Sequence, residues 1–300
     1  MTKRKSAEEW FAEGCRYDAD KSQRDRAIAA YKESIKLDGS SIDAYVRLGL
    51  LLLEARAFED ALSCFKKATD LEPQNAALLN NVAYTYERME RLGTARQIYG
   101  RILELKPDDW GAAARIAHSF EAEGDYHSAV EYFEKAISIA PNNPVPRFGL
   151  ASLYDRYDMF DEAIADYEAT LEIDPYHTQA LFRIANLYLQ EGQYRRAIQF
   201  YKRFLLLVPD EKVAWNNLGS AYEGMEDFAR AEKAFRHVLT LDPCHQDANY
   251  GLAKARYLQG WQGLSDEEKK DVIRRLHFIL SLDPNNHEAE SLVRCLENER

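Results

Sequence analysis

One set of side chains suited to ligand recognition recurs along the chain at intervals of 34 residues. It consists of Arg47, Asn81, Arg115, Gly149, Arg183 and Asn217. An amide offers donors and an acceptor, and a guanidinium offers five N–H donors. A ladder of Asn and Arg can therefore hold an extended peptide backbone or a carboxylate. The alternative is a polar surface that contacts only water.

Two further positions of the same period add apolar and polar groups beside this ladder. Directly before a ladder position stand Phe148, Phe182, Asn216 and Tyr250. Three residues after a ladder position stand Tyr84, His118, Ser152, Asn186, Ser220 and Lys254. Aromatic rings next to amides and guanidinium groups are typical of a peptide site. We therefore predict a peptide-binding groove, strongest over residues 110–245.

A position six residues after the ladder is acidic in several periods. Its acidic members are Glu87, Glu121, Asp155 and Glu223. These carboxylates either pair with the ladder arginines or select a partner that carries basic residues. Exposed ion pairs contribute little stability, so specificity and association rate are their expected role.

Motifs for catalysis and for metal binding are missing from the sequence. It contains no phosphate-binding loop, no nucleophile elbow and no H-E-x-x-H motif. None of the seven histidines has a second His or Cys at the spacing of zinc ligands. We therefore expect no catalytic residues, no cofactor and no metal, and the chain is not expected to be an enzyme.

The overall composition restricts the partners further. With 39 basic against 50 acidic residues, the net charge of −11 argues against nucleic acid as a partner. No apolar run approaches the roughly 20 residues that a membrane-spanning helix needs, so no membrane insertion is expected. Four cysteines without a C-x-x-C pair are too few for a disulfide scaffold. They suit the reducing cytoplasm, which is the predicted location.

The elements that must position these side chains follow from the same period. In a frame of 34 residues, position 20 is always Ala and position 24 is always aromatic. The aromatic residues are Phe65, Tyr99, Phe133, Tyr167, Tyr201 and Phe235. Apolar residues spaced by three and four mark two helices in each frame, which we call the A helix and the B helix. Each frame has a proline two residues before its end, where a B helix cannot continue. We therefore predict helix pairs, with the aromatic residue packed between helices.

The last complete frame carries a recognisable signature. It contains Trp215, Leu218, Gly219, Tyr222, Ala231, Phe235 and Pro243. Together these residues resemble the full tetratricopeptide repeat (TPR) signature. The resemblance implies an all-α fold, a right-handed superhelical solenoid whose A helices line a concave face. It also implies that the ladder and its neighbouring positions face that groove.

The frames define the expected organisation of a single solenoid over residues 1–300. The six regular repeats are 42–75, 76–109, 110–143, 144–177, 178–211 and 212–245. A divergent repeat, 7–41, precedes them. A divergent repeat with an insertion, 246–285, and a polar capping helix, 286–300, follow. Within the insertion, Ser265 and Glu268 have the spacing of a capping box that opens a helix.

The resulting functional prediction is a non-catalytic protein–protein interaction scaffold that binds a peptide segment of a partner in the concave groove. One alternative is a structural scaffold that self-assembles into homo-oligomers through its end repeats or the insertion at Trp261. Another is an accessory subunit of a separate enzyme such as a glycosyltransferase. It arises because the ladder partly resembles the asparagine ladder of repeats fused to O-linked glycosyltransferases. An RNA-binding helical-repeat protein is a third alternative, which the net charge opposes.

Overall fold

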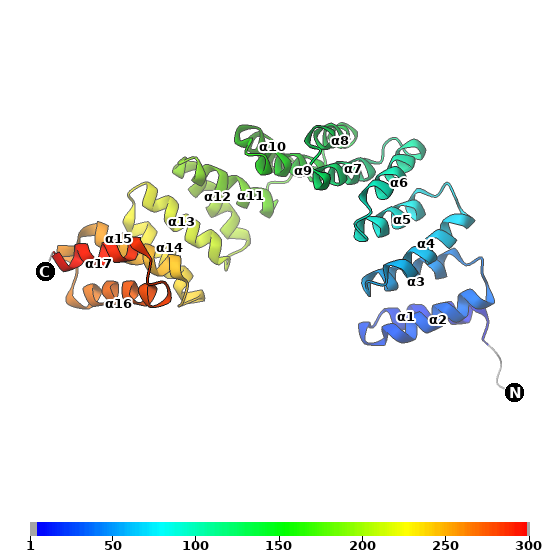
Figure 1. Cartoon of the computed structure of the whole chain (residues 1–300), viewed down its shortest axis with the longest axis horizontal. Coiled ribbons are helices and arrows are strands. Elements are labelled where there is room, and N and C mark those ends of the chain that lie inside the picture. The colour runs from blue at the N-terminus through cyan, green and yellow to red at the C-terminus, as the bar shows by residue number, and fades with distance from the viewer. Residues whose placement is uncertain (1–4, 299–300) are drawn as a thin grey trace. The chain divides into compact units, whose positions relative to one another are not determined.

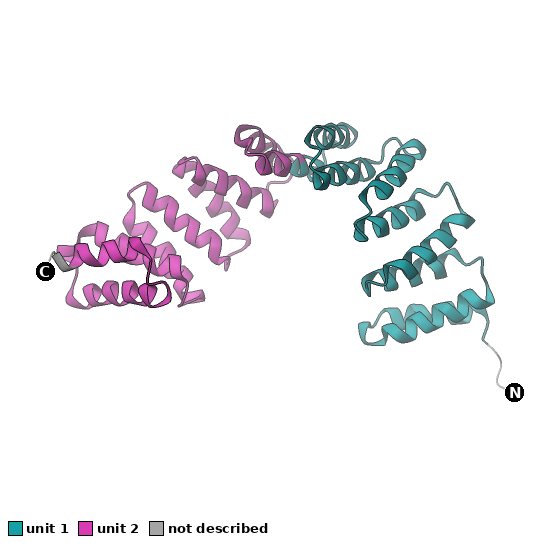
Figure 2. Ribbon diagram, in the orientation of Figure 1, with its two compact units in different colours: residues 1–149 teal, residues 150–300 magenta. Residues whose placement is uncertain are grey.

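The computed structural model describes the backbone of residues 5–298 and the side chains of residues 5–296. Every regular element in this part of the chain is helical. The last two residues of the predicted capping helix, 299–300, lie outside the described residues. The chain divides into two compact units, Met1–Gly149 and Leu150–Arg300 (Figure 2). We describe each unit by itself.

The first unit is a row of helix pairs in which each helix contacts the next along the chain (Figure 1). Its helices are α1 (Ala7–Asp18), α2 (Arg24–Leu37), α3 (Ile42–Glu54), α4 (Phe58–Leu71), α5 (Ala76–Arg88), α6 (Leu92–Leu105), α7 (Trp110–Glu123) and α8 (Tyr126–Ile139), with a short 3₁₀ helix at Lys21–Gln23. Helix α9 (Pro144–Arg156) begins in this unit and ends in the second.

The second unit continues the same arrangement of paired helices. Its helices are α10 (Phe160–Ile173), α11 (Thr178–Gln190), α12 (Tyr194–Leu207), α13 (Lys212–Gly224), α14 (Phe228–Leu241), α15 (Gln246–Gly260), α16 (Asp266–Leu282) and α17 (His287–Asn298), with a 3₁₀ helix at Trp261–Gly263. The A helices α11, α13 and α15 also touch one another directly. They form one layer, and the B helices α12 and α14 form a second layer beside it (Figure 1).

The turn between an A helix and its B helix has one conformation throughout the regular repeats. A residue one or two positions after the A helix has a left-handed backbone, with φ between 58° and 78°. It is Arg56, Glu90, Gly124, Asp158, Gly192 or Glu226. A left-handed residue of this kind ends a helix and reverses the chain, which places the B helix back against the A helix.

The small and aromatic frame positions pack as the sequence predicts. Phe133 and the alanines at position 20 are almost completely buried. A β-carbon added to Gly49 would lie 2.6 Å from the ring of Phe65, and one added to Gly219 would lie 2.6 Å from the ring of Phe235. Only a residue without a side chain allows the helices of those pairs to approach so closely. The aromatic stripe is therefore core.

The insertion near the C-terminus is also part of a core. Ser265 and Glu268 form the predicted capping box at the start of α16. Trp261 is 6% exposed and belongs to an apolar cluster with Val272 and Leu276 of α16. Its ring is consequently not an exposed surface through which copies of the chain could associate.

No helix in the described part of the chain combines the length and the apolar character needed to cross a membrane. Within the same residues, His, Cys, Asp and Glu side chains form no group of three or more that could hold a metal ion.

Candidate peptide-binding groove

The ladder arginines form ion pairs with the acidic residues of the preceding A helix. In the first unit, Arg47 lies 3.9 Å from Asp18, and Arg115 lies 2.9 Å from Glu87. In the second unit, Arg183 lies 3.9 Å from Asp155. The sequence left open whether these carboxylates pair with the ladder or select a basic partner. The structure has Glu87 and Asp155 paired with ladder arginines, whereas Glu121 contacts His118 and Glu223 contacts Lys254.

A buried tyrosine completes each of these contacts. The tyrosine stands at position 24 of the frame, in the B helix. Its hydroxyl donates a hydrogen bond to the acidic residue in the A helix of the same repeat. The three O–H···O distances are 3.3 Å for Tyr31 to Asp18, 3.1 Å for Tyr99 to Glu87 and 3.2 Å for Tyr167 to Asp155. Burial and the neighbouring carboxylate raise the pKa of Tyr99 above its usual value, so the hydroxyl remains a donor. We call each set of tyrosine, acid and arginine a tyrosine link.

The fourth contact of this kind uses amides in place of charges. Asn186 Oδ1 accepts from the Tyr201 hydroxyl at 2.5 Å and from Asn217 Nδ2 at 3.1 Å. The link therefore joins α11, α12 and α13. It brings two predicted site residues together through a hydrogen bond that the sequence did not predict.

A covariation inside the sequence could have revealed these links. Where position 24 is Tyr31, Tyr99, Tyr167 or Tyr201, the residue 16 positions later is Arg47, Arg115, Arg183 or Asn217. Where position 24 is Phe133 or Phe235, that residue is Gly149 or Gly251, whereas Phe65 is followed at this distance by Asn81. A β-carbon at either glycine would lie 2.5 Å from the phenylalanine ring. The residue type at most ladder positions thus depends on how one repeat packs on the next.

The ladder arginines nevertheless keep part of their surface in solvent. The side chains of Arg47, Arg115 and Arg183 are 55%, 45% and 59% exposed. Each guanidinium is held in place by a carboxylate while some of its N–H donors face outward. A fixed, partly solvated guanidinium can still donate to a peptide carbonyl or a carboxylate.

The remaining predicted residues of the first unit lie around these arginines. The Arg115 guanidinium lies over the Tyr84 ring at 5.2 Å. His118 contacts Glu121 at 3.0 Å and meets the Phe133 ring edge-on at 5.0 Å. Asn81 and Phe148 are half-buried.

In the second unit, Phe182 lines a hollow that reaches the next A helix. The hollow has a volume of about 360 Å³ and is lined by Thr178, Gln179, Phe182, Phe204, Glu211 and Val213. The rings of Phe182 and Phe204 lie 5.2 Å apart. Phe148 belongs to the first unit, so a groove that contains both Phe148 and Phe182 stays a prediction.

Polar groups of α13 are also available on this side of the unit. Asn216 Oδ1 is buried and has no hydrogen-bond partner among the described residues. Ser220 donates to the Asn216 carbonyl at 3.3 Å. In α9, Ser152 lies 3.3 Å from the Tyr167 hydroxyl. Buried polar atoms usually have a partner, so the unpaired Asn216 oxygen marks a place where a ligand would add one.

The C-terminal end of the predicted groove is partly covered by α17. A hollow of about 410 Å³ between α15 and α17 is lined by Tyr250 and Lys254 on one side and by His287 and Glu288 on the other. Burial and the charge of Glu288 raise the pKa of Tyr250 to about 12. Lys254 forms an ion pair with Glu223. These two predicted site residues therefore lie against the cap.

A solenoid of helix pairs with a polar ladder along its A helices defines a class of binding scaffold. Tetratricopeptide repeat models match residues 52–117, 121–165 and 157–220, and related models of the same description match 16–76 and 213–244. The chain belongs to the tetratricopeptide repeat family, and this membership supports a role in protein–protein interaction. No curated protein sequence matches it significantly.

Solved structures with the same fold are distant in sequence. The C-terminal part of a TPR repeat-containing protein from Cytophaga hutchinsonii is 18% identical with a TM-score of 0.64, over 81% of this chain and 99% of that one. PilF from Pseudomonas aeruginosa is 19% identical with a TM-score of 0.53, over 68% and 92%. These likenesses show the fold alone.

A longer structure matches more of the chain. The APC/C hetero-tetramer Cut9–Hcn1 is 20% identical with a TM-score of 0.49, over 91% of this chain. This chain spans 52% of that chain, about half its length.

Proposed function

We propose that the chain is a non-catalytic scaffold that binds a peptide segment of a partner protein on the side of its A helices. The observation that carries this proposal is the hollow beside Phe182, which lies between two consecutive A helices. An apolar side chain of the peptide enters this hollow. The partly exposed Arg183 guanidinium donates to its polar groups.

The proposed binding mode relies on side chains that are already fixed. Arg183 is held by Asp155, and Asn217 is held by Asn186. Pre-organised groups lose less conformational entropy when a ligand binds.

The four cysteines are free thiols, which supports the cytoplasm as the location.

Affinity capture from the native lysate followed by mass spectrometry tests the groove. The blocking variant is Val213→Asp, because Val213 lines the hollow and is 49% exposed, so the chain should still fold. The matched control is Leu71→Asp in α4, where Leu71 is 44% exposed and lines no part of the hollow. We expect a protein that wild type and Leu71→Asp capture and that Val213→Asp loses.

Capture of the same proteins by Val213→Asp would place the interaction elsewhere. Light scattering over a range of concentrations distinguishes self-assembly, since a groove binder keeps its mass and an assembling protein does not. A captured enzyme would identify the chain as an accessory subunit, with catalysis in the separate chain.

A further inference from the structure

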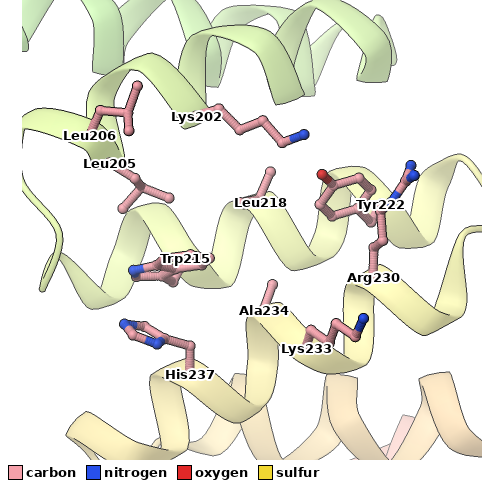
Figure 3. A pocket seen from close by; sticks show the side chains of 10 residues that line it. All are labelled: Lys202, Leu205, Leu206, Trp215, Leu218, Tyr222, Arg230, Lys233, Ala234 and His237. Atoms are coloured by element: carbon pink, nitrogen blue, oxygen red, sulfur yellow. The ribbon is translucent and has the colours of Figure 1, made fainter.

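A second hollow lies on the opposite face of α13. Its floor is formed by Trp215, Leu218 and Tyr222, and its volume is about 550 Å³ (Figure 3). Because successive residues of a helix are rotated by about 100°, this stripe lies on the far side of α13 from Asn216, Asn217 and Ser220. The walls come from the B helices α12 and α14. The hollow is therefore separate from the proposed groove.

One of the residues that line the hollow, in α14, is small. In α12, Phe200 at position 23 stacks on Tyr188 of its A helix at 5.6 Å. In α8, Tyr132 at the same position lies 5.7 Å from Phe120. In α14 the residue at this position is Ala234, so no ring of α14 stacks on Tyr222, which is itself 6% exposed. The repeat thus lacks the ring that these two repeats carry, and alanine is smaller than the Cys64, Ile98 and Asp166 of the remaining regular repeats.

The edge of the hollow carries an apolar residue where the other regular repeats carry a polar one. Leu206 is 82% exposed and lines the hollow from α12. The residues at its frame position in the other regular repeats are all polar: Asp70, Glu104, Ser138, Glu172 and Thr240. An isolated exposed leucine has no packing role, but beside an apolar hollow it extends the apolar surface.

The charges around the hollow have a single sign. Lys202, Arg230 and Lys233 line it, and no acidic residue does. Arg230 pairs with Asp227 at 3.0 Å, whereas neither lysine has an ion-pair partner among the described residues. Lys202 Nζ lies 5.7 Å from the centre of the Tyr222 ring. In a chain with a net charge of −11, this local basic rim favours an acidic ligand.

A polar atom in the hollow also lacks a partner. The His237 ring lies 4.3 Å from the Trp215 ring, and His237 Nε2 is buried without a hydrogen bond to any described residue. The indole N–H of Trp215 is already used, since it donates to the Pro209 carbonyl at 2.7 Å. The polar capacity that remains here belongs to His237 and the two lysines.

We propose that this hollow is a second binding site, which takes a partner peptide with a large apolar side chain flanked by carboxylates. The apolar side chain enters the hollow over Trp215 and Leu218, beside Ala234. The carboxylates pair with Lys202 and Lys233. The site occupies the B-helix side of the second unit, so it leaves the A-helix groove free for another segment.

Selection from a random-peptide phage library tests the proposal. The library is first depleted on the full-length Ala234→Phe variant, which supplies the missing ring, and then selected on the wild-type chain. We expect the enriched peptides to combine an aromatic or large aliphatic residue with at least two carboxylates. In fluorescence anisotropy, Ala234→Phe and Lys202→Glu/Lys233→Glu should each weaken the binding of an enriched peptide by about tenfold or more.

A matched charge reversal separates local from general charge effects. Lys66 occupies the frame position of Lys202 and lies 5.3 Å from the Tyr86 ring, but Ile98 fills the position of Ala234 there. Lys66→Glu should therefore leave the affinity unchanged. The double lysine variant changes only exposed residues, so it decides the question even if Ala234→Phe fails to fold.

Three results would overturn the proposal. They are the absence of any enriched peptide after depletion, enriched peptides without acidic residues, and equal loss of affinity with Lys66→Glu and with the double lysine variant. Retention of binding by the Val213→Asp variant is expected, because that residue belongs to the other hollow.

Discussion

At the scale of the residue, each tyrosine link connects two consecutive helix pairs through one carboxylate. The Tyr99 hydroxyl donates to Glu87, and Glu87 pairs in turn with Arg115 of the following repeat. Hydrogen bonds to charged groups are stronger than neutral ones, and a partly buried carboxylate between two donors is well satisfied. The link therefore fixes a guanidinium at the edge of the A-helix face.

Removal of one hydroxyl tests the energetic value of a link. Tyr99→Phe deletes the hydrogen bond to Glu87 and leaves the buried ring in place. We expect the free energy of unfolding in urea to fall by about 0.5–1.5 kcal/mol. The control, Tyr176→Phe, removes a hydroxyl from a residue that is 73% exposed and should change little. Equal stability of the two variants would show that the link contributes nothing.

At the scale of the element, glycine decides how closely one repeat approaches the next. Gly149 in α9 lies against the Phe133 ring of α8, which leaves no room for a β-carbon. Gly100 in α6 lies in open space, with nothing within 4 Å of the place where a β-carbon would be. Packing therefore requires glycine at position 149, whereas nothing in the packing requires it at position 100.

Alanine at these two positions should have opposite effects. Gly149→Ala places a β-carbon 2.5 Å from Phe133, and we expect a loss of about 1–3 kcal/mol in the free energy of unfolding. Gly100→Ala removes backbone freedom from the unfolded chain and should gain about 0.5–1 kcal/mol. Circular dichroism during urea unfolding measures both. A gain for Gly149→Ala would mean that α9 can shift away from Phe133 without cost.

At the scale of the whole molecule, stability comes from contacts between neighbouring helices, so each end needs its own closure. At the C-terminus, Arg256 is 7% exposed and joins three helices. Its guanidinium donates to Glu232 of α14 at 3.1 Å and to Asp271 of α16 at 2.6 Å. Removing one partner from a buried ion pair leaves an uncompensated charge, so this network stabilises the terminal repeat.

The network predicts a pH dependence of stability. Burial opposes ionisation of Glu232 and Asp271, but hydrogen bonds from Gln259, Arg256 and Arg275 outweigh it and lower both pKa values. A lowered pKa contributes stability above the unfolded-state value, and this contribution disappears as the pH falls through the folded-state value. The C-terminal repeat should therefore lose stability as the pH falls from about 5 towards 3.

Trp261 provides the signal for this measurement, because it is buried in the C-terminal cluster. A variant with Phe at the other three tryptophans would be unfolded in urea at several pH values. Adding Arg256→Met removes the hydrogen bonds of Arg256 to both carboxylates, so the pH dependence should become flatter. An unchanged slope would assign the acid sensitivity to other carboxylates.

The family, the helical fold and the core stripe could all be predicted from the pattern of residues. Alternation of Ala, an aromatic residue and Pro every 34 residues specifies helices of defined length. Each helix packs mainly on its sequence neighbours, so local periodicity carries most of the fold. The resemblance to the family predicts a partner-binding helix face, but it does not say which residues on that face are committed to packing.

The contacts between side chains of different helices could not be predicted from that pattern. The pairing of Arg115 with Glu87, the burial of Trp261 and the hollow above Tyr222 depend on distances between neighbouring helices. Those distances follow from the angle and the offset at which neighbouring helices stack. The repeat period and the residue types do not specify this angle or offset. The ladder that the sequence presents as a ligand site therefore also joins one repeat to the next, and a separate hollow lies between the B helices α12 and α14.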